Sequence, residues 1–509
     1  MSAGLGRAYA VSVEGVDGRI VEVEADISQS LPAFVLLGLP DSSLKEAKER
    51  IRSAAKNSGH ALPPRKLTVN LLPAGVPKRG PGFDLAIVVA ALQAEGCLPP
   101  QGPTVFLGEL SLEGRLRPVQ GILPAVLTAV RAGYARVVCP RADHREAALV
   151  PGAEVFSFDT LEQVLSWAGS ASAAWTPLSE LPPEPAPVEG EREDFAHVLG
   201  QPEACEAAVV AAAGGHHLLM VGPPGVGKSM IAQRLPGILP PLSMEDALTV
   251  SAVHSSSGLG YRADRLAVPP FEAPHHTSSL AALVGGGPHL RPGAISRAHL
   301  GVLFLDEACE FERRSLDGLR QPLESGRVRI ERVRGSITLP ARFQLVLATN
   351  PCPCGMDGSG RSACTCTSIA RRRYAARLSG PLLDRIDVRV RLRHLTGFTD
   401  SRGTVMTTAQ AAARVAAARA RALDRLRALG FERNADVPGD VLRGGLRLPG
   451  ATTRSLDDAL ARGAVSARGY DRVLRVAWTL ADLEDAPGPS AEHLARAALL
   501  REPEGVTYA

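Results

Sequence analysis

A glycine-rich segment that ends in lysine and serine carries the clearest chemical signal in the sequence. Residues 222–229 read Gly-Pro-Pro-Gly-Val-Gly-Lys-Ser and match the pattern G-x-x-x-x-G-K-[ST] at every fixed position. In such a loop the backbone N–H groups turn inward around nucleotide phosphates, the lysine bridges the terminal phosphates, and the serine hydroxyl ligates Mg²⁺. An apolar run at 218–221 and a helix-compatible run at 230–235 flank the segment, which favours a phosphate loop over a chance glycine-rich turn. The expected nucleotide-binding residues are Gly222, Pro223, Pro224, Gly225, Val226, Gly227, Lys228 and Ser229.

Two carboxylates and an amide follow further apolar runs. Residues 301–307 read Gly-Val-Leu-Phe-Leu-Asp-Glu, and residues 345–350 read Leu-Val-Leu-Ala-Thr-Asn. Strands of an open α/β sheet present their carboxyl ends to ligands, so we expect Asp306 to hold Mg²⁺ and Glu307 to polarise the attacking water. Asn350 would orient that water, although an asparagine after a strand is by itself more typical of a turn. The alternative for the Asp-Glu pair is capping of the next helix, which the complete phosphate loop makes less favoured. Together these residues predict an ATPase that uses ATP and Mg²⁺.

Four of the eight cysteines crowd into residues 352–366. They form C-x-C, nine intervening residues and C-x-C, at Cys352, Cys354, Cys364 and Cys366. Four thiolates can close a tetrahedral structural Zn²⁺ site, and this glycine- and serine-rich stretch has little else to fold around. One residue between paired cysteines is less usual than two, and free reduced thiols or a redox pair are the alternatives. The other cysteines have apolar neighbours and are expected in the core: Cys97, Cys139, Cys205 and Cys309. For His275 and His276 we expect a structural or loop role, because neighbours on an extended chain point opposite ways.

An arginine-rich segment between Glu324 and Leu339 has alternating character. Gly335 lies where a turn is needed, so we expect a β-hairpin. Its four arginines are Arg327, Arg329, Arg332 and Arg334. They could contact the phosphate backbone of DNA, the alternative being an ordinary solvated hairpin. Because only 4% of the residues are aromatic, few rings can stack on bases, and we expect backbone contacts without sequence reading.

Composition limits the class of protein. The chain has 509 residues, of which 45% are hydrophobic and 22% charged; this mixture is too apolar for a disordered protein and too even for a membrane protein. No apolar run approaches the roughly 18 residues of a spanning helix, and the first nine residues lack a signal-peptide pattern. Eight cysteines are too few for a disulfide scaffold, so we expect a reducing cytoplasm. Because the net charge is only +4, any nucleic-acid surface must be local.

The length favours three domains, at roughly 150 residues each. Residues 1–168 alternate short apolar runs with helical stretches, which predicts an α/β or α+β domain. Residues 169–192 are rich in Ser, Ala, Pro and Glu, which predicts an extended linker. Strand-like runs separated by long segments over 193–395 predict a parallel sheet with crossovers. Residues 396–509 lack strand signals and are expected to form a helical lid, so the overall fold class is α/β.

The order of phosphate loop, Asp-Glu pair, strand-terminal asparagine and helical lid resembles the AAA+ ATPases. Five shorter motifs resemble the Mg-chelatase-like branch of that group, and the chain is similar nearly end to end to the YifB/ComM family. The motifs are Ala-Pro-His-His-Thr from Ala273, Leu-Val-Gly-Gly-Gly-Pro from Leu283, Arg-Pro-Gly-Ala-Ile-Ser from Arg291, Asn-Pro-Cys-Pro-Cys-Gly from Asn350 and Arg-Leu-Ser-Gly-Pro-Leu-Leu-Asp-Arg-Ile-Asp from Arg377.

This resemblance implies roles for three residues and a ring-shaped assembly. Asn350 corresponds to sensor 1, and Arg468 resembles sensor 2 on the lid. Arg385 resembles the arginine finger that reaches the γ-phosphate of a neighbouring subunit, which implies a homo-oligomeric ring, usually a hexamer. Arg377 and Arg472 lie close by in the sequence, and most arginines in such a chain are solvated surface residues. In AAA+ relatives a hairpin before sensor 1 points into the pore of the ring.

Residues 9–168 resemble the Lon-protease-like (S5-type) α+β domain that is fused to ATPases of this family. Its proteolytic dyad consists of a serine in a Gly-Pro-Ser-Ala-Gly-like turn and a lysine after a later glycine pair. Here Gly82 and Leu123 fall at those places, so covalent peptide hydrolysis has no nucleophile and no amine to activate it. The interpretation as an ATP-dependent protease fails there, and we expect a binding or assembly module.

The resemblance implies an ATP-hydrolysing ring motor that acts on single-stranded or branched DNA, with branch migration or helicase activity in recombination and natural transformation. The alternative is a chelatase-type remodeller of a protein or metal-tetrapyrrole complex. The Mg-chelatase ATPase subunit lacks a Lon-like domain, and this chain has no integrin-like metal-binding domain; both points favour the DNA motor. No membrane partner is expected.

Overall fold

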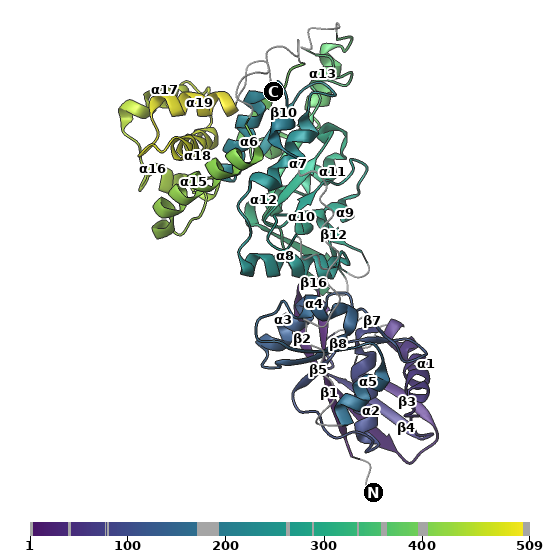
Figure 1. Cartoon of the computed structure of the whole chain (residues 1–509). Helices are drawn as coiled ribbons and strands as arrows, with labels where there is room; N and C mark the ends of the chain where they lie inside the picture. Colours follow the sequence, from purple (N-terminus) through teal and green to yellow (C-terminus); the bar gives the residue numbers. More distant parts are fainter. Residues whose placement is uncertain are drawn as a thin grey trace. The chain divides into compact units, whose positions relative to one another are not determined.

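The computed structural model describes residues 4–38, 42–76, 78, 81–169, 193–260, 265–287, 290–332, 335–357, 364–394 and 406–501. The chain divides into two compact units (Figure 1). The first consists of residues 1–187 and 248–266, and the second of residues 188–247 and 267–509. The linker predicted at 169–192 lies, apart from residue 169, outside the described residues. None of the helices in the described ranges is long and apolar enough to cross a membrane.

A seven-stranded mixed sheet forms the centre of the first unit. Its order is β3-β4-β2-β1-β5-β8-β9, with β1/β2 and β2/β4 antiparallel and the other pairs parallel. The strands are β1 Gly6–Glu14, β2 Asp17–Ser28, β3 Ala33–Leu37, β4 Lys66–Leu72, β5 Thr104–Phe106, β8 Arg136–Pro140 and β9 Glu154–Phe158; β6 Glu109–Leu110 and β7 Leu116–Arg117 form a separate short pair. The helices are α1 Ser42–Asn57, α2 Asp84–Ala94, α3 Ile122–Arg131, α4 His144–Ala147 and α5 Leu161–Gly169.

Apolar side chains pack on both faces of this sheet. Buried positions alternate with less buried ones along β2, as in a strand with two different faces. One cluster joins Val21 and Val23 of β2 to α1 and α2, and α2 is buried nearly all round. A second cluster joins Val11 and Val105 to α3. The sheet is therefore the common wall of two cores.

Helix α8 (Met244–Ser257) contributes its second half to the first unit. Leu248 and Ala252, which are one turn apart, lie in the same apolar cluster as α3. Gln120 Nε2 donates a hydrogen bond to the backbone oxygen of Ser256 at 2.7 Å. A segment that follows the phosphate loop in the sequence is therefore part of the core of the N-terminal unit.

A parallel five-stranded sheet forms the centre of the second unit. Its order is β11-β14-β17-β10-β18, and every neighbouring pair is parallel, which confirms the predicted parallel sheet. The strands are β10 Leu218–Val221, β11 Phe271–Glu272, β14 Val302–Leu305, β17 Gln344–Thr349 and β18 Val388–Arg391. β10, β14 and β17 are buried along their whole length, which is why they read as continuous apolar runs. The helices are α6 Pro202–Gly214, α7 Lys228–Ile238, α9 Leu280–Val284, α10 Ala294–Arg297, α11 Arg313–Asp317, α12 Arg320–Ser325, α13 Ser368–Ala375 and α14 Gly380–Leu383.

The predicted hairpin is present as β15 (Arg327–Arg332) and β16 (Gly335–Pro340). The two strands pair antiparallel from Arg327 opposite Pro340 to Arg332 opposite Gly335. Val328 and Ile330 are buried, whereas Arg327 and Arg329 are exposed. One face of the hairpin therefore packs on the protein and the other presents guanidinium groups. The side chain of Arg332 and the whole of Arg334 lie outside the described part of the hairpin.

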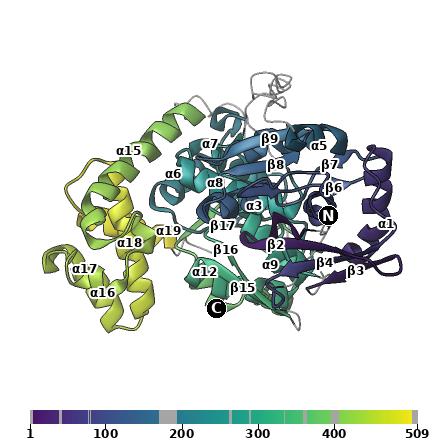
Figure 2. The same ribbon diagram turned by 90° about the horizontal axis from the view of Figure 1, so that it is seen from below.

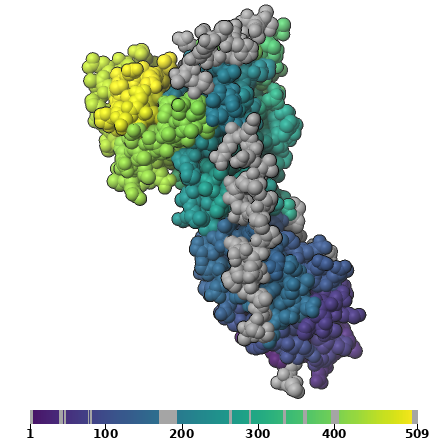
Figure 3. Space-filling model, viewed as in Figure 1, coloured from purple at the N-terminus to yellow at the C-terminus, as the bar shows by residue number. Residues whose placement is uncertain are grey.

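Five helices follow the sheet in residues 406–501, and we refer to them as the lid. They are α15 Thr408–Leu426, α16 Gly439–Arg443, α17 Gly450–Ala461, α18 Ala467–Leu483 and α19 Ala491–Arg501. Within residues 406–501 there is no strand. The lid forms a lobe beside α6 (Figures 2 and 3), and a single apolar cluster runs from the sheet through α6 into α15 and α18. A capping box of Thr407 and Gln410 fixes the start of α15.

A buried ion pair joins the sheet of the second unit to the lid. Asp387, just before β18, is 3% exposed and accepts hydrogen bonds from His216 Nδ1 at 2.9 Å and from the guanidinium of Arg472 in α18. Burial raises the pKa of Asp387, but the charge of Arg472 and the hydrogen bond from His216 lower it more, so the pKa lies well below its ordinary value. An ionised carboxylate is thus held between the core and the lid.

Replacing Arg472 by methionine leaves the buried Asp387 carboxylate without its cationic partner. We expect the free energy of unfolding to fall by about 3–5 kcal/mol, as for other broken buried ion pairs. Because folding lowers the pKa of Asp387, the wild-type contribution is present above the ordinary carboxyl pKa and is lost as the pH falls below about 4. Urea unfolding of both proteins at pH 7, and of the wild type at decreasing pH, measures these effects.

Arg443→Ala is the matched control. Arg443 also pairs with an aspartate of α18, Asp471, but 51% of the Arg443 side chain is exposed. An exposed pair contributes at most about 1 kcal/mol. Equal losses of stability in the two variants would show that burial does not set the strength of these ion pairs.

Candidate active site

The phosphate loop connects the buried strand β10 to helix α7. Gly225 and Gly227 have φ angles of 76° and 95°, in the left-handed region that side chains disfavour, so both positions need glycine. Helix α7 begins at Lys228, and Gly227 is its N-cap. The unpaired N–H groups of the first helical turn therefore lie next to the loop, an arrangement that attracts anions.

Lys228 is held between the loop and the end of a neighbouring strand. Its ammonium donates to the backbone oxygens of Gly222 and Pro223 at 2.6 and 2.7 Å and to Asn350 Oδ1 at 3.2 Å. The residue is 8% exposed, and burial lowers the pKa of the ammonium to about 8. All three acceptors are uncharged oxygens. These three contacts therefore leave the charge of the ammonium unneutralised, and a bound anion would favour the charged form of Lys228.

Ser229 and Asp306, the two expected Mg²⁺ ligands, lie in contact. Ser229 Oγ donates to Asp306 Oδ2 at 2.7 Å, and Asp306 Oδ1 accepts from the backbone N–H of Glu307 at 2.9 Å. Strands β10 and β14 both pair with β17, so the residues after them meet at one edge of the sheet. A hydroxyl and a carboxylate oxygen at this spacing are donors of the type that Mg²⁺ takes.

Glu307 follows Asp306 with a φ of 51°, which is rare for a residue other than glycine. Its Oε2 lies 3.0 Å from His276 Nδ1, and about half of its side chain is exposed. His276 belongs to the loop after β11, the strand that pairs with β14. The structural or loop role expected for His275 and His276 did not include this contact. No local signal in the sequence marks this contact, because β11 has only two residues and was not predicted as a strand.

A cavity of about 340 Å³ lies between these residues. Its walls are formed by Pro224, Gly225, Gly227, Lys228, Ser229, Met230, Asp306, Glu307, Thr349 and Asn350. Three residues of the expected nucleotide-binding segment do not line it: Gly222, Pro223 and Val226. Two of these supply the backbone oxygens that hold Lys228, and Val226 is buried beneath the loop. Met230 and Thr349 also line the cavity, although no sequence motif singled them out.

The arginines expected to act on the nucleotide lie outside this cavity. Arg385, between α14 and β18, donates to the backbone oxygen of Pro381 at 2.5 Å and pairs with Glu324. Arg468 is exposed in the first turn of α18. Of their sequence neighbours, Arg472 is paired with Asp387, and Arg377 contacts Cys309 and Glu310. The structure therefore does not bring Arg385 or Arg468 to the phosphate loop of the same chain.

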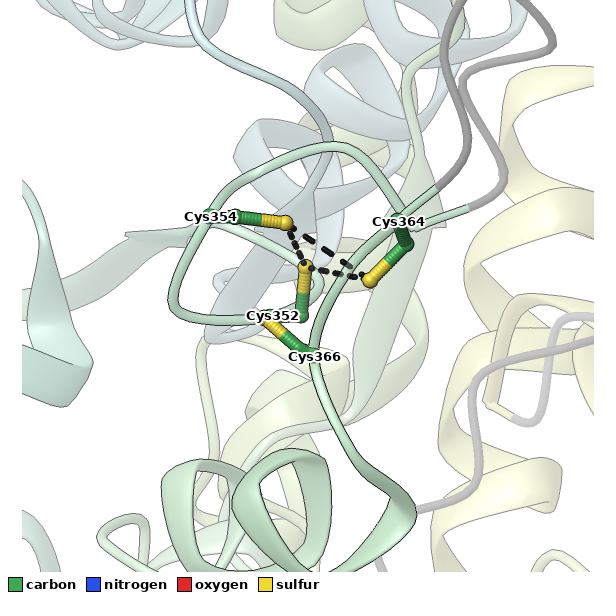
Figure 4. Close-up of side chains that lie close together, drawn as sticks. All are labelled: Cys352, Cys354, Cys364 and Cys366. Atoms are coloured by element: carbon green, nitrogen blue, oxygen red, sulfur yellow. Dashed lines mark hydrogen bonds between the residues drawn. The ribbon is translucent and has the colours of Figure 1, made fainter.

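The four clustered cysteines converge on one point (Figure 4). Their sulfur atoms lie within 4.8 Å of one another, and the closest pairs are 3.3 Å for Cys352 with Cys354 and 3.6 Å for Cys364 with each of these. Zn–S bonds of about 2.3 Å in a tetrahedron require S–S distances of about 3.8 Å. Hydrogen bonding, above all from the backbone N–H of Met356, lowers the pKa of the Cys354 thiol to about 6. The donor set thus fits a tetrahedral thiolate site.

The remaining cysteines follow the expectation except at one position. Cys139, Cys205 and Cys309 are buried, as predicted. The prediction for Cys97 is wrong: it is exposed, because it lies in the turn that follows α2.

The N-terminal unit has neither member of a Ser-Lys dyad at the expected places. Gly82 lies in a short 3₁₀ turn, and Leu123 is fully buried in α3. The two segments are neighbours, since a Cβ atom added at Gly82 would lie 3.2 Å from Val119 Cγ1. Neither Gly82 nor Leu123 carries the hydroxyl or the amine that a dyad needs.

Comparison with known proteins gives matches along most of the chain. The matching family models are described as magnesium chelatase, subunit ChlI (residues 194–399), subunit ChlI of Mg-chelatase (residues 23–143) and magnesium chelatase, subunit ChlI C-terminal (residues 405–501). A Lon protease of Mycolicibacterium smegmatis is 29% identical over 182 residues, which are 34% of this chain and 23% of that protein.

Three relatives are similar over nearly their whole length. The uncharacterized protein Rv2897c of Mycobacterium tuberculosis is 48% identical over 504 residues, 98% of this chain and 99% of the relative. The uncharacterized protein YifB of Salmonella typhimurium is 39% identical over 493 residues, 96% and 95% of the two chains. The competence protein ComM of Haemophilus influenzae is 36% identical over 496 residues, 96% of each chain. This chain therefore belongs to the YifB/ComM family of Mg-chelatase-like AAA+ proteins.

Proposed function

We propose that this protein hydrolyses ATP at the cavity around Lys228 and uses the energy to move DNA through a ring of identical subunits. One observation carries the proposal: a lysine, a hydroxyl, two carboxylates and an amide from separate strand ends surround a single cavity next to a helix N-terminus. Membership in the Mg-chelatase-like AAA+ family implies ATP and Mg²⁺ and suggests ATPase activity.

Binding of the triphosphate follows from the chemistry of the phosphate loop. The ammonium of Lys228 already lies among oxygen acceptors, and terminal phosphate oxygens would add the negative charge that these acceptors lack. The N–H groups at the start of α7 add partial positive charge on the same side. Ser229 and Asp306 would hold Mg²⁺, which neutralises charge on the β- and γ-phosphates when it is bound.

Hydrolysis requires a base for the attacking water. Glu307 accepts a proton from that water as the water oxygen forms a bond to the γ-phosphorus. The bond between the γ-phosphorus and the β,γ-bridging oxygen breaks, which gives ADP and inorganic phosphate. Asn350, whose Oδ1 accepts from Lys228, can offer its two Nδ2 donors to the water or the γ-phosphate. The contact with His276 holds the Glu307 carboxylate at the rim of the cavity.

In a ring, a neighbouring subunit would supply a further positive charge to the γ-phosphate. The cavity walls, as far as the described residues form them, contain Lys228 but no arginine. A γ-phosphate in transfer gains from a guanidinium, and Arg385 of a neighbouring subunit would supply it, with Arg468 acting from the lid. Because neither residue lines the cavity of its own chain, the complete site would need a homo-oligomer, which in this family is usually a hexamer.

The assignment of DNA as the substrate rests on the hairpin of β15 and β16. Its Arg327 and Arg329 are exposed in a chain whose net charge is only +4, and Arg329 also pairs with Glu331 at 3.0 Å in an exposed ion pair that DNA phosphates could replace. Such a localised patch suits contact with phosphates of single-stranded or branched DNA without sequence reading. The relative ComM is by its name a competence protein, which supports branch migration or helicase activity during DNA recombination.

A chelatase-type remodeller of a protein or metal-tetrapyrrole complex is the second candidate. All three matching family models carry the description of the Mg-chelatase subunit ChlI, and one of them covers residues 23–143 of the N-terminal unit. The presence of this unit is therefore a weaker argument against a chelatase than the sequence alone suggested. Stimulation of ATP turnover by DNA separates the two candidates.

The cysteine cluster would hold a structural Zn²⁺. Four thiolates saturate a tetrahedral ion and leave no open position for substrate, so the metal would support the fold of its loop. No cysteine of the cluster lines the nucleotide cavity, which agrees with a structural role.

Glu307→Gln keeps the shape of the side chain but removes its ability to accept a proton. We expect ATP turnover to fall at least about 100-fold, the usual contribution of a general base, while ATP still binds. A coupled assay of ADP release measures turnover, and a fluorescent ATP analogue measures binding. Unchanged turnover would show that Glu307 is not the base; loss of binding as well would mean that the substitution disturbs the site more broadly.

Arg385→Ala tests whether active sites are shared between subunits. We expect this variant and Lys228→Ala each to be inactive alone. If the two are mixed and reassembled, about a quarter of the interfaces should combine an intact loop with an intact Arg385, so activity should reappear. ATPase assays of both proteins and of their mixture measure this. An active Arg385→Ala protein, or a mixture without activity, would contradict the shared site.

Forked or Holliday-junction DNA should stimulate ATP turnover, and the double variant Arg327→Ala, Arg329→Ala should lose most of the stimulation. Removal of two phosphate contacts per subunit should also make DNA binding less dependent on salt. Arg313→Ala, whose side chain is 71% exposed on α11, is the matched control. If branched DNA neither stimulates turnover nor binds at low salt, the DNA motor is wrong and the chelatase-type remodeller gains support.

A further inference from the structure

The segment that carries the four cysteines, residues 352–366, which we call the cysteine loop, closely follows a residue of the candidate nucleotide site in the sequence. Asn350 lines the cavity and accepts a hydrogen bond from Lys228, and Cys352 is only two residues further along the chain. Cys352 is fully buried, and its backbone oxygen accepts from the N–H of Gly355 at 2.9 Å, which closes a tight turn over residues 352–355. The first two cysteines therefore lie within one turn of a residue that contacts the phosphate-loop lysine.

Gly355 brings this turn against the phosphate loop itself. A Cβ atom added to Gly355 would lie 2.8 Å from Pro224 Cδ and 3.9 Å from Asn350 Cγ. The φ angle of Gly355 is 76°, so the position also favours glycine for its backbone. Pro224 is a wall of the cavity. The turn of the cysteine loop thus packs directly on the loop that would bind the phosphates.

Apart from the cysteines, one partly exposed ion pair ties this segment to helix α13: Arg371 donates to Asp357 Oδ1 at 3.0 Å. Such a pair contributes at most about 1 kcal/mol. Of the described residues in 352–366, only Cys352 and Gly355 are buried, and glycine has no side chain to pack. The second pair, Cys364 and Cys366, precedes helix α13 and lies beside the first pair. An ion bound by all four sulfur atoms would connect the turn to the start of α13, as structural zinc sites do for loops without an apolar core.

We propose that Zn²⁺ bound by Cys352, Cys354, Cys364 and Cys366 fixes the turn of residues 352–355 against Pro224 and Asn350, so that ATP turnover depends on a metal that takes no part in the chemistry. This inference rests on the proposed ATPase function and adds a second metal requirement to it. The Zn²⁺ would not contact the phosphates. It would act on them through the positions of Pro224 and Asn350, which line the cavity.

The experiment tests separately the effect of zinc binding and the effect of the contact between Gly355 and Pro224. Cys354→Ser removes one exposed ligand, whereas Gly355→Ala keeps all four thiols and places a methyl group against Pro224. Cys97→Ser, another exposed cysteine, and Gly463→Ala, which has a φ of 72° and nothing within 4 Å of an added Cβ, are the matched controls. Mass spectrometry of the native proteins measures zinc content, and ATPase assays give kcat and KM.

We expect one zinc per wild-type chain, and both controls should resemble the wild type. Cys354→Ser should lose zinc and at least tenfold in kcat/KM. Gly355→Ala should retain zinc and still lose several-fold in kcat/KM, mainly through a higher KM for ATP, because Pro224 is displaced. If Cys354→Ser does not fold, removal of zinc from the wild type with a chelator and its return should abolish and restore turnover.

Four results would contradict the proposal, and they show which part of it fails. A wild-type protein without zinc rules out the metal site. Loss of zinc with full ATP turnover rules out the coupling to the phosphate loop, as does a Gly355→Ala protein with unchanged kcat/KM. A protein that carries zinc but hydrolyses no ATP contradicts the proposed function on which the inference rests.

Discussion

The adjacency of three parallel strands is the constraint on which the candidate site depends. β17 lies between β14 and β10, so the residues that follow these strands share one edge of the sheet. Asn350 therefore reaches Lys228 at 3.2 Å, and Asp306 reaches Ser229 at 2.7 Å, although 122 and 77 residues separate the partners in sequence. A different strand order would leave the same side chains too far apart to act on one phosphate group. The geometry of the candidate site is therefore a property of the sheet topology.

The same sheet also carries the connection to the lid. Asp387 precedes β18, the edge strand next to β10, and its carboxylate is bound by Arg472 of α18. The phosphate loop that follows β10 and the anchor of the lid are therefore attached to neighbouring strands. The two features lie at opposite ends of these parallel strands, which are hydrogen-bonded to each other along their length.

How much could be predicted from the sequence depends on whether the signal was local. The phosphate loop and the strand ends at Asp306 and Asn350 could be predicted because apolar runs followed by polar residues specify strands and their termini. The pairing of β15 with β16 could be predicted for a similar reason: alternation and a glycine at a turn are local patterns. The strand order was not predicted, and it decides which ends meet.

Long-range contacts were the features that the sequence could not supply. The contact of His276 with Glu307 depends on β11 pairing with β14, and neither residue type reveals it. Cys97 has apolar neighbours in the sequence, yet it lies in a turn beyond the end of α2 and is exposed. The packing of Gly355 against Pro224 joins two loops whose sequences are each consistent with ordinary turns. A local sequence pattern specifies a helix, strand or turn. Which of these pack against one another is decided only in the folded chain.

The participation of α8 in the first unit limits how the gene product can be divided. Leu248 and Ala252 complete the cluster around α3, so a fragment that stops after residue 187 would leave an apolar surface of α3 open to water. Cleavage of the chain at one connecting segment would consequently not give two fragments that each contain a complete unit. Transfer of the N-terminal unit to another protein would therefore require residues 248–266 as well as residues 1–187.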